Sequence, residues 1–143
     1  MIRSFVINKY LSSEFLKITT LVTLIFFSLG FILNLFEEIN FFKDYDVGIN
    51  VPIFMSALFV PNFIYNIFPF IILISGIWFF LKIKKNDEII AIKASGMSNF
   101  SVISIPSVLS LVLGIFFITS ITPVTSELVK KYESIKNSYE KEQ

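Results

Sequence analysis

Three long stretches without a charged residue limit the folds that this chain can adopt more than any other feature does. They cover residues 18–36, 51–81 and 100–124, which are 19, 31 and 25 residues long. About 20 helical residues cross a hydrocarbon core of roughly 30 Å, so each stretch is long enough to span a bilayer. Core helices of soluble proteins rarely stay uncharged over such a length. The sequence therefore predicts an all-α membrane protein with three transmembrane helices.

The composition excludes several kinds of chemistry. The 143 residues contain neither His nor Cys, so the usual zinc and copper ligand sets are missing. A net charge of +1 gives no bias toward nucleic acid. The three uncharged stretches also lack the titrating residues that a membrane enzyme would place inside its spans. We expect no catalytic residue, no metal site and no cofactor.

The basic residues in the connecting segments predict the orientation. Residues 1–17 contain three Lys or Arg, residues 37–50 contain one, and residues 82–99 contain four. Cytoplasmic segments of membrane proteins carry the excess of Lys and Arg. The N-terminus and residues 82–99 are therefore predicted to be cytoplasmic.

The remaining segments are expected to be helical extensions of the spans. Residues 1–17 form either a helix lying in the membrane interface or a plain extension of the first span. Residues 51–81 would reach about 46 Å as one straight helix, so we expect a lead-in turn and a proline kink. Residues 125–143 form a charged tail on the far side. Gly30 and Gly114 indicate places where another helix approaches closely.

A short helix is predicted over residues 86–97, on the cytoplasmic side. Asn86 is a good N-cap, the two acids that follow suit the positive end of a helix, and Gly96 is a natural C-cap. The helix is too rich in isoleucine to be a free loop. It either packs along lipid headgroups or docks into a cytoplasmic partner.

The residues of this loop carry a family resemblance. The stretch Glu-Ile-Ile-Ala-Ile-Lys-Ala-Ser-Gly-Met-Ser at residues 88–98, after a long second span that ends in lysines, resembles the permease family of the lipopolysaccharide export transporter. Lys9-Tyr10 near the start, Thr122-Pro123 and Lys131-Tyr132-Glu133 extend the similarity over essentially the whole chain. The last of these, with Glu37-Glu38, looks more like the G-type subunit than the F-type.

The resemblance implies a fold and a set of partners. The family has six transmembrane helices with a periplasmic β-jellyroll between the third and fourth. This chain resembles the N-terminal part, without the jellyroll. Its expected partners are a cytoplasmic ATPase dimer that hydrolyses ATP, a paralogous permease subunit, a periplasmic bridge protein, lipopolysaccharide and membrane lipid. The implied location is the bacterial inner membrane.

The resemblance also implies roles for individual residues. The short cytoplasmic helix would be the coupling helix that fits a groove on the ATPase, through Asp87, Glu88, Ile89, Ile92 and Met97. The first span would form one side of a gate for lipid A, through Ile25, Phe26, Phe31, Asn34 and Leu35. Where the family's G-type subunit carries cations near the outer end of this span, this sequence has Asn34 and then two acids. This departure puts phosphate binding by the first span in doubt. The expected role of these residues is therefore apolar contact with acyl chains.

One rival interpretation belongs to a different functional class. A small three-span membrane interaction or assembly protein, with no transport role, would show the same hydropathy pattern. In that protein, residues 86–97 would bind only lipid headgroups.

Overall fold

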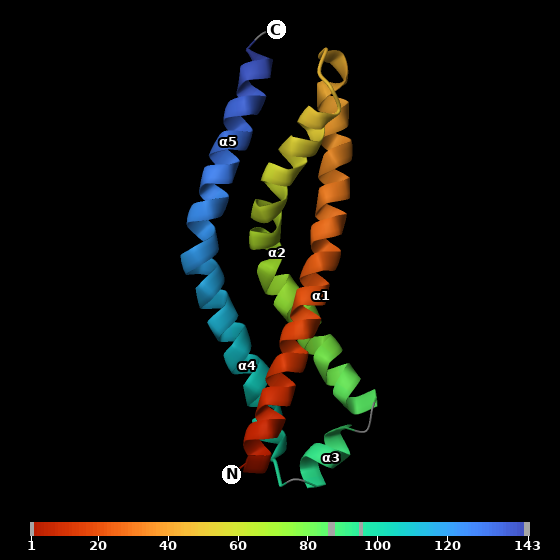
Figure 1. The fold of residues 1–143 in the computed structure, drawn as a ribbon, viewed down its shortest axis with the longest axis vertical. Coiled ribbons are helices and arrows are strands. Elements are labelled where there is room, and N and C mark those ends of the chain that lie inside the picture. Colours follow the sequence, from red (N-terminus) through yellow and green to blue (C-terminus); the bar gives the residue numbers. More distant parts are fainter. Residues whose placement is uncertain (1, 86–87, 95, 142–143) are drawn as a thin grey trace. The chain divides into compact units, whose positions relative to one another are not determined.

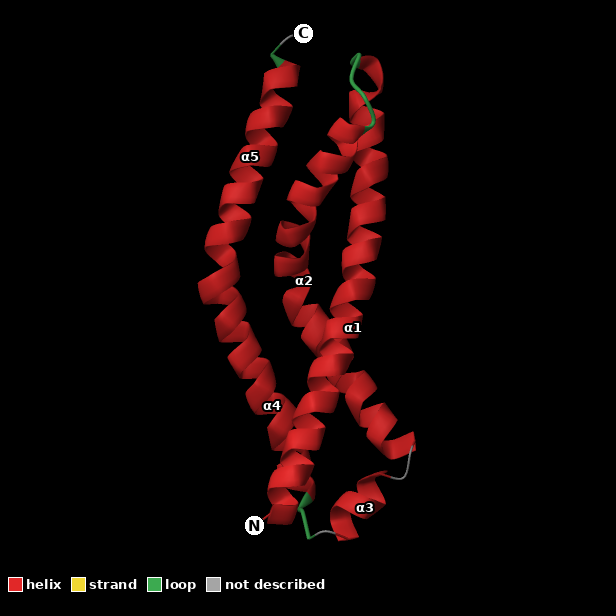
Figure 2. Ribbon diagram, in the orientation of Figure 1, coloured by secondary structure: helices red, strands yellow, loops and turns green. Residues whose placement is uncertain are grey.

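The computed structural model describes residues 2–85, 88–94 and 96–141, and nearly all of them are helical (Figures 1 and 2). Within these residues there is no strand. The elements in chain order are α1 (Ile2–Phe41), the short 3₁₀ helix η1 (Phe42–Asp44), α2 (Asn50–Lys85), α3 (Glu88–Ala94), α4 (Asn99–Phe116), the π-helical turn η2 (Phe117–Ile121) and α5 (Thr122–Glu140).

Three of the helical runs are long and apolar enough to cross a membrane, which confirms the predicted all-α fold with three spans. Each run contains one of the uncharged stretches found in the sequence. Many of their apolar side chains are exposed, such as Leu33 at 67% and Ile118 at 63%. Such side chains would be costly in water and suit a hydrocarbon environment, so the fold is that of a membrane protein.

The helices extend well beyond the uncharged stretches. Residues 2–17 belong to α1, with no break before the first span. The last turn of α2 carries Lys82, Lys84 and Lys85, where positive charge is favoured by the helix dipole. Much of the predicted tail, up to Glu140, is the helix α5.

The chain divides into two compact regions, each built from parts of the three long helices. Region 1 comprises Met1–Thr23 and Pro69–Ile115, and region 2 comprises Leu24–Phe68 and Phe116–Gln143. In region 1, the rings of Phe15 and Phe79 meet edge to face with centroids 5.6 Å apart, and both side chains are fully buried. This aromatic pair joins α1 to the second half of α2.

Region 2 holds two other close contacts. A Cβ atom on Gly30 would lie 2.5 Å from Cδ1 of Phe63, so glycine is needed for α2 to approach α1 here. This confirms the expected close approach at Gly30. Phe117, the first residue of the π-helical turn, stacks on Phe68 with ring centroids 3.6 Å apart. At Gly114, in region 1, no described atom lies within 4 Å of such a Cβ, so the close approach expected there is not found.

Candidate functional site

Helix α3 is the short helix between α2 and α4 (Figure 1). The helix ends at Ala94, and Gly96 follows it with a φ of +86°, a conformation that residues with a side chain rarely adopt. The Gly96 N–H donates a hydrogen bond of 2.9 Å to the carbonyl of Lys93. The predicted glycine cap is therefore confirmed. Asn86 and Asp87, the expected N-cap and first acid, lie outside the described residues.

Glu88 begins α3 and binds a residue far away in the sequence. The Tyr10 hydroxyl donates a hydrogen bond of 3.0 Å to Glu88 Oε2, across 78 positions in the chain. A carboxylate in the first turn is also favoured by the helix dipole. The contact attaches the start of α3 to the N-terminal part of α1.

The isoleucines of α3 have different surroundings. Ile92 is only 5% exposed and lines a cavity of about 360 Å³ with Val6, Tyr10 and Glu88. Ile89 is half-buried and lines a second cavity, of about 390 Å³, beside the last turns of α2 and the start of α4. Ile90 is 63% exposed. The apolar side chain of α3 with most surface available to a partner is thus Ile90.

This distribution changes the list of contact residues taken from the sequence. Ile92, expected to face a partner, instead packs inside region 1, while Ile89 and Met97 are half-buried. Ile90 was missed. Positions 88 and 92 are four residues apart and so share a helix face, whereas position 90 faces away from it. That spacing could have identified Ile90, once one of the faces was known to pack internally.

The residues expected to form the lipid gate all lie on the part of α1 that belongs to region 2. Ile25 is 45% exposed, and Phe26, Phe31 and Leu35 are half-buried. Asn34 is only 4% exposed, and its Oδ1 atom has no recorded hydrogen-bond partner among the described residues. Asn34 therefore points into region 2, and Ile25 offers the largest apolar surface of the set.

A buried carboxylate near the end of α1 was not anticipated. Glu38 is fully buried, and its Oε1 accepts hydrogen bonds from the Tyr132 hydroxyl at 2.5 Å and from Lys136 Nζ at 3.3 Å. Lys136 also donates to the Tyr132 oxygen at 3.0 Å. Tyr132 and Lys136 are four residues apart on α5, so they share one face. In the sequence, Glu38 looked like one of several loop acids.

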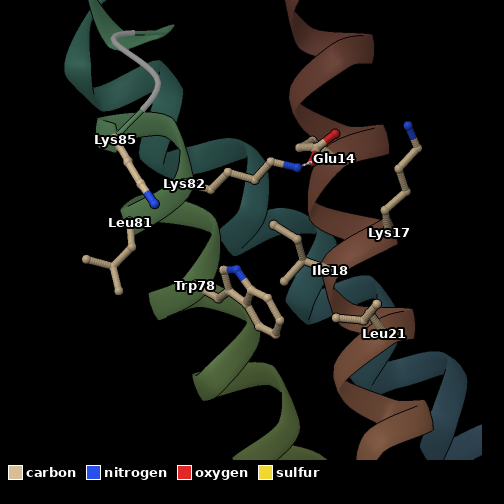
Figure 3. A pocket seen from close by; sticks show the side chains of 8 residues that line it. All are labelled: Glu14, Lys17, Ile18, Leu21, Trp78, Leu81, Lys82 and Lys85. Atoms are coloured by element: carbon tan, nitrogen blue, oxygen red, sulfur yellow. Dashed lines mark hydrogen bonds and ion pairs between the residues drawn. The ribbon is translucent and has the colours of Figure 1, made fainter.

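A second ion pair joins α1 to α2 in region 1. Lys82 Nζ contacts Glu14 Oε1, and Figure 3 shows the lysine reaching across to the carboxylate. The Glu14 side chain is 9% exposed and that of Lys82 is 39% exposed. Each of the two regions thus contains one carboxylate of α1 that is buried and paired with a lysine of another helix.

The described residues hold no group of His, Cys, Asp and Glu that would bind a metal ion. Nor do they show a nucleophile paired with a base. The arrangement offers instead a small, capped helix fastened to the ends of two spans.

Comparison with known proteins identifies the family. The model of the family described as "Lipopolysaccharide export system permease LptF/LptG" matches residues 9–143, which is nearly the whole chain. No curated protein and no solved structure matches. The family description covers both subunit types, so it does not separate the G-type from the F-type. With its three membrane-spanning helices and this match, the chain belongs to the lipopolysaccharide export system permease family LptF/LptG.

Proposed function

We propose that the chain acts as a permease subunit in lipopolysaccharide export, and that α3 couples it to a cytoplasmic ATPase. The observation that carries the proposal is the construction of α3. It is short, capped by Gly96, attached to α1 through Glu88 and Tyr10, and presents Ile90 outward. A free loop would need none of these contacts.

The proposed orientation supports this role. The excess of lysine at the end of α2 and the bases near the N-terminus favour a cytoplasmic position for α3. An ATPase in the cytoplasm would reach the exposed face of α3 directly. The carboxylate of Glu88 would pair with a cation of the ATPase, and Ile90 would fill an apolar groove.

The contacts of α3 suggest how a movement would reach the spans. A push on α3 acts on α1 through Glu88 and Tyr10, and Ile92 packs beside the same part of α1. Ile89 lies against the last turns of α2. Packed helices shift as rigid bodies more easily than they deform, so nucleotide-driven closure of the ATPase would displace these parts of the spans together.

If the chain is a permease subunit, further partners are expected. Besides the ATPase dimer, these are a paralogous permease subunit, a periplasmic bridge protein and lipopolysaccharide. Ile25 and its neighbours on α1 would contact acyl chains at the gate. Assignment to the G-type subunit stays a prediction from Glu37-Glu38 and the segment around Tyr132.

Co-purification with the ATPase tests the coupling role. The chain and the ATPase of the same export system are co-expressed, and the ATPase retained on the membrane-extracted chain is measured for wild type, Glu88→Lys and Ile90→Asp. We expect both variants to insert in the membrane and to retain at least about tenfold less ATPase, which corresponds to about 1.4 kcal/mol of binding free energy.

Tyr10→Phe is the matched control. It removes the hydroxyl that donates to Glu88 but leaves the carboxylate, so the ATPase should still be retained. If Tyr10→Phe loses the ATPase as completely as Glu88→Lys, the carboxylate acts only within the chain and direct coupling through Glu88 is wrong. If no variant changes retention, α3 is an interfacial helix without a coupling role.

A further inference from the structure

A groove between α1 and α2 in region 1 has no part in the proposed coupling. Its volume is about 630 Å³. Four of the residues that line it are charged: Glu14 and Lys17 from α1, and Lys82 and Lys85 from α2. Three cations and one anion leave a formal charge of +2, and the one anion is already paired with Lys82. Within the described residues, no ion pair is recorded for Lys17 or Lys85.

The other lining residues are apolar. They are Ile18 and Leu21 from α1, and Trp78 and Leu81 from α2. All four fall inside the uncharged stretches, whereas the four charged residues fall just outside them. The groove therefore crosses the boundary between the hydrocarbon core and the headgroup layer. Tryptophan is enriched at this depth because its ring is apolar and its N–H is polar.

Figure 3 shows the arrangement of these side chains. Lys82 reaches from α2 to Glu14, and the Trp78 ring lies between the two helices beside Ile18. Lys85 lies beyond the Lys82 end of the bridge and Lys17 beyond the Glu14 end, with the Lys17 side chain pointing away from α2. The bridge keeps the two helices together at one end of the groove, and leaves two lysines to attract an anion.

We propose that this groove binds an anionic phospholipid of the membrane, with its headgroup at the positively charged end of the groove, which Lys17 and Lys85 flank, and an acyl chain along Trp78 and Leu81. A polar end that is positive and an apolar end at membrane depth match the two parts of such a lipid. Basic pockets between transmembrane helices on the cytoplasmic side are typical sites for anionic headgroups. The proposed orientation assigns the lipid to the cytoplasmic leaflet; the site itself does not depend on coupling to an ATPase.

Trp78 provides the measurement, because it is the only tryptophan in the sequence. The full chain is reconstituted in phosphatidylcholine bilayers that contain a small fraction of phosphatidylglycerol. Bromine on the acyl chains quenches tryptophan fluorescence only at short range. Brominated phosphatidylglycerol is compared with brominated phosphatidylcholine at the same mole fraction. We expect the anionic lipid to quench Trp78 at a several-fold lower mole fraction than the zwitterionic lipid.

Two double variants that remove the same charge test which lysines cause the preference for the anionic lipid. Lys17→Gln/Lys85→Gln removes two lysines of the groove, and Lys9→Gln/Lys84→Gln removes two lysines of the same helices that do not line it. Each lysine near an anionic headgroup contributes about fivefold in affinity, so the first variant should lose most of the preference. The second should keep it. Trp78 fluorescence before bromine is added checks that each variant is folded.

Three results would overturn the proposal. Equal quenching by the two brominated lipids would mean that the groove has no anionic preference. Equal loss in the two double variants would mean that general surface charge attracts the lipid. Relief of quenching by millimolar inorganic phosphate would mean that the groove binds a free phosphate and not a lipid. None of these results depends on the ATPase, so failure here is distinguishable from failure of the coupling role.

Discussion

The hydroxyl of Tyr132 lies 2.5 Å from the fully buried Glu38 Oε1, which joins α5 to the C-terminal end of α1. A buried carboxylate is costly unless hydrogen-bond donors compensate it; Tyr132 and Lys136 both donate to Oε1, while the buried Oε2 has no hydrogen-bond partner among the described residues. The Lys136 ammonium also lies 4.4 Å from the centre of the Phe41 ring. This cluster is the most densely connected polar feature of region 2.

Removing the tyrosine hydroxyl tests how much the hydrogen bond from Tyr132 to Glu38 contributes to stability. We expect Tyr132→Phe to lower the free energy of unfolding in detergent by about 1–3 kcal/mol, because Glu38 would stay buried with one donor fewer. Tyr139→Phe is the control. Its ring contacts Phe42 and Tyr45, and no hydrogen bond of its hydroxyl is recorded within the described residues. An equal loss in both variants would contradict a special role for Tyr132.

The ion pair of Glu14 and Lys82 should show coupling in a double-mutant cycle. We expect Glu14→Gln and Lys82→Gln each to destabilise the protein, and the double variant to lose less than the sum. The coupling free energy should be about 0.5–1.5 kcal/mol, because Lys82 is partly exposed and its charge is screened. Additive losses in thermal unfolding would show that the pair contributes nothing as a pair.

Two glycines should respond to alanine in opposite directions. Gly30→Ala should destabilise the protein, because the new Cβ would meet the Phe63 ring at 2.5 Å. Gly114→Ala should be neutral or stabilising by about 0.5–1 kcal/mol, because the helix gains rigidity and no described atom lies in the way. Melting temperatures of the two variants check this. Adding Phe63→Ala to Gly30→Ala should recover part of the loss if the clash is its cause.

The cap of α3 should be sensitive to a side chain at position 96. Gly96→Ala places a Cβ in the left-handed region and should cost about 1–2 kcal/mol locally. We expect faster hydrogen exchange at the amides of residues 88–94, while the exchange in α1 and α2 stays unchanged. Gly48→Ala is the control, because Gly48 has no positive φ and open space around it. Unchanged exchange in α3 would mean that its other contacts hold the helix without the cap.

Orientation can be measured without background, because the chain contains no cysteine. We expect Asp44→Cys to react with a membrane-impermeant maleimide in intact spheroplasts, and Lys84→Cys to react only after permeabilisation. Both side chains are exposed. The reverse labelling pattern would place α3 in the periplasm and exclude coupling to a cytoplasmic ATPase.

The sequence predicted the spans well, because the absence of charge over 19 to 31 residues is a property of each segment alone. Glycine predicted the cap at Gly96 and the close approach at Gly30, but the same argument failed at Gly114, where no described atom lies within 4 Å of an added Cβ. The family match over residues 9–143 agrees with the motifs around Glu88 and Tyr132.

The burial of individual polar residues was harder to predict. Glu38 looks like an ordinary loop acid in the sequence and Glu14 like an ordinary acid of the N-terminal segment, because their partners lie 94 and 68 positions away. Pairing over such distances depends on which helix faces meet, and hydropathy does not contain that information. The burial of Ile92 was not anticipated for the same reason. In the sequence, Ile90 and Ile92 suit an interface equally well.

The π-helical turn at Phe117–Ile121 sets the direction in which the side chains of α5 point, relative to that of Phe117. A π turn holds one residue more than an α turn, and one residue corresponds to about 100° of rotation. It begins at Phe117, which stacks on Phe68, and precedes Tyr132, which bonds to Glu38. Deleting one residue from the turn would make the helix regular, but would swing the tyrosine about a quarter-turn away from its carboxylate while the phenylalanines stayed stacked. An irregularity of the backbone thus allows two distant contacts on a single helix to be satisfied together.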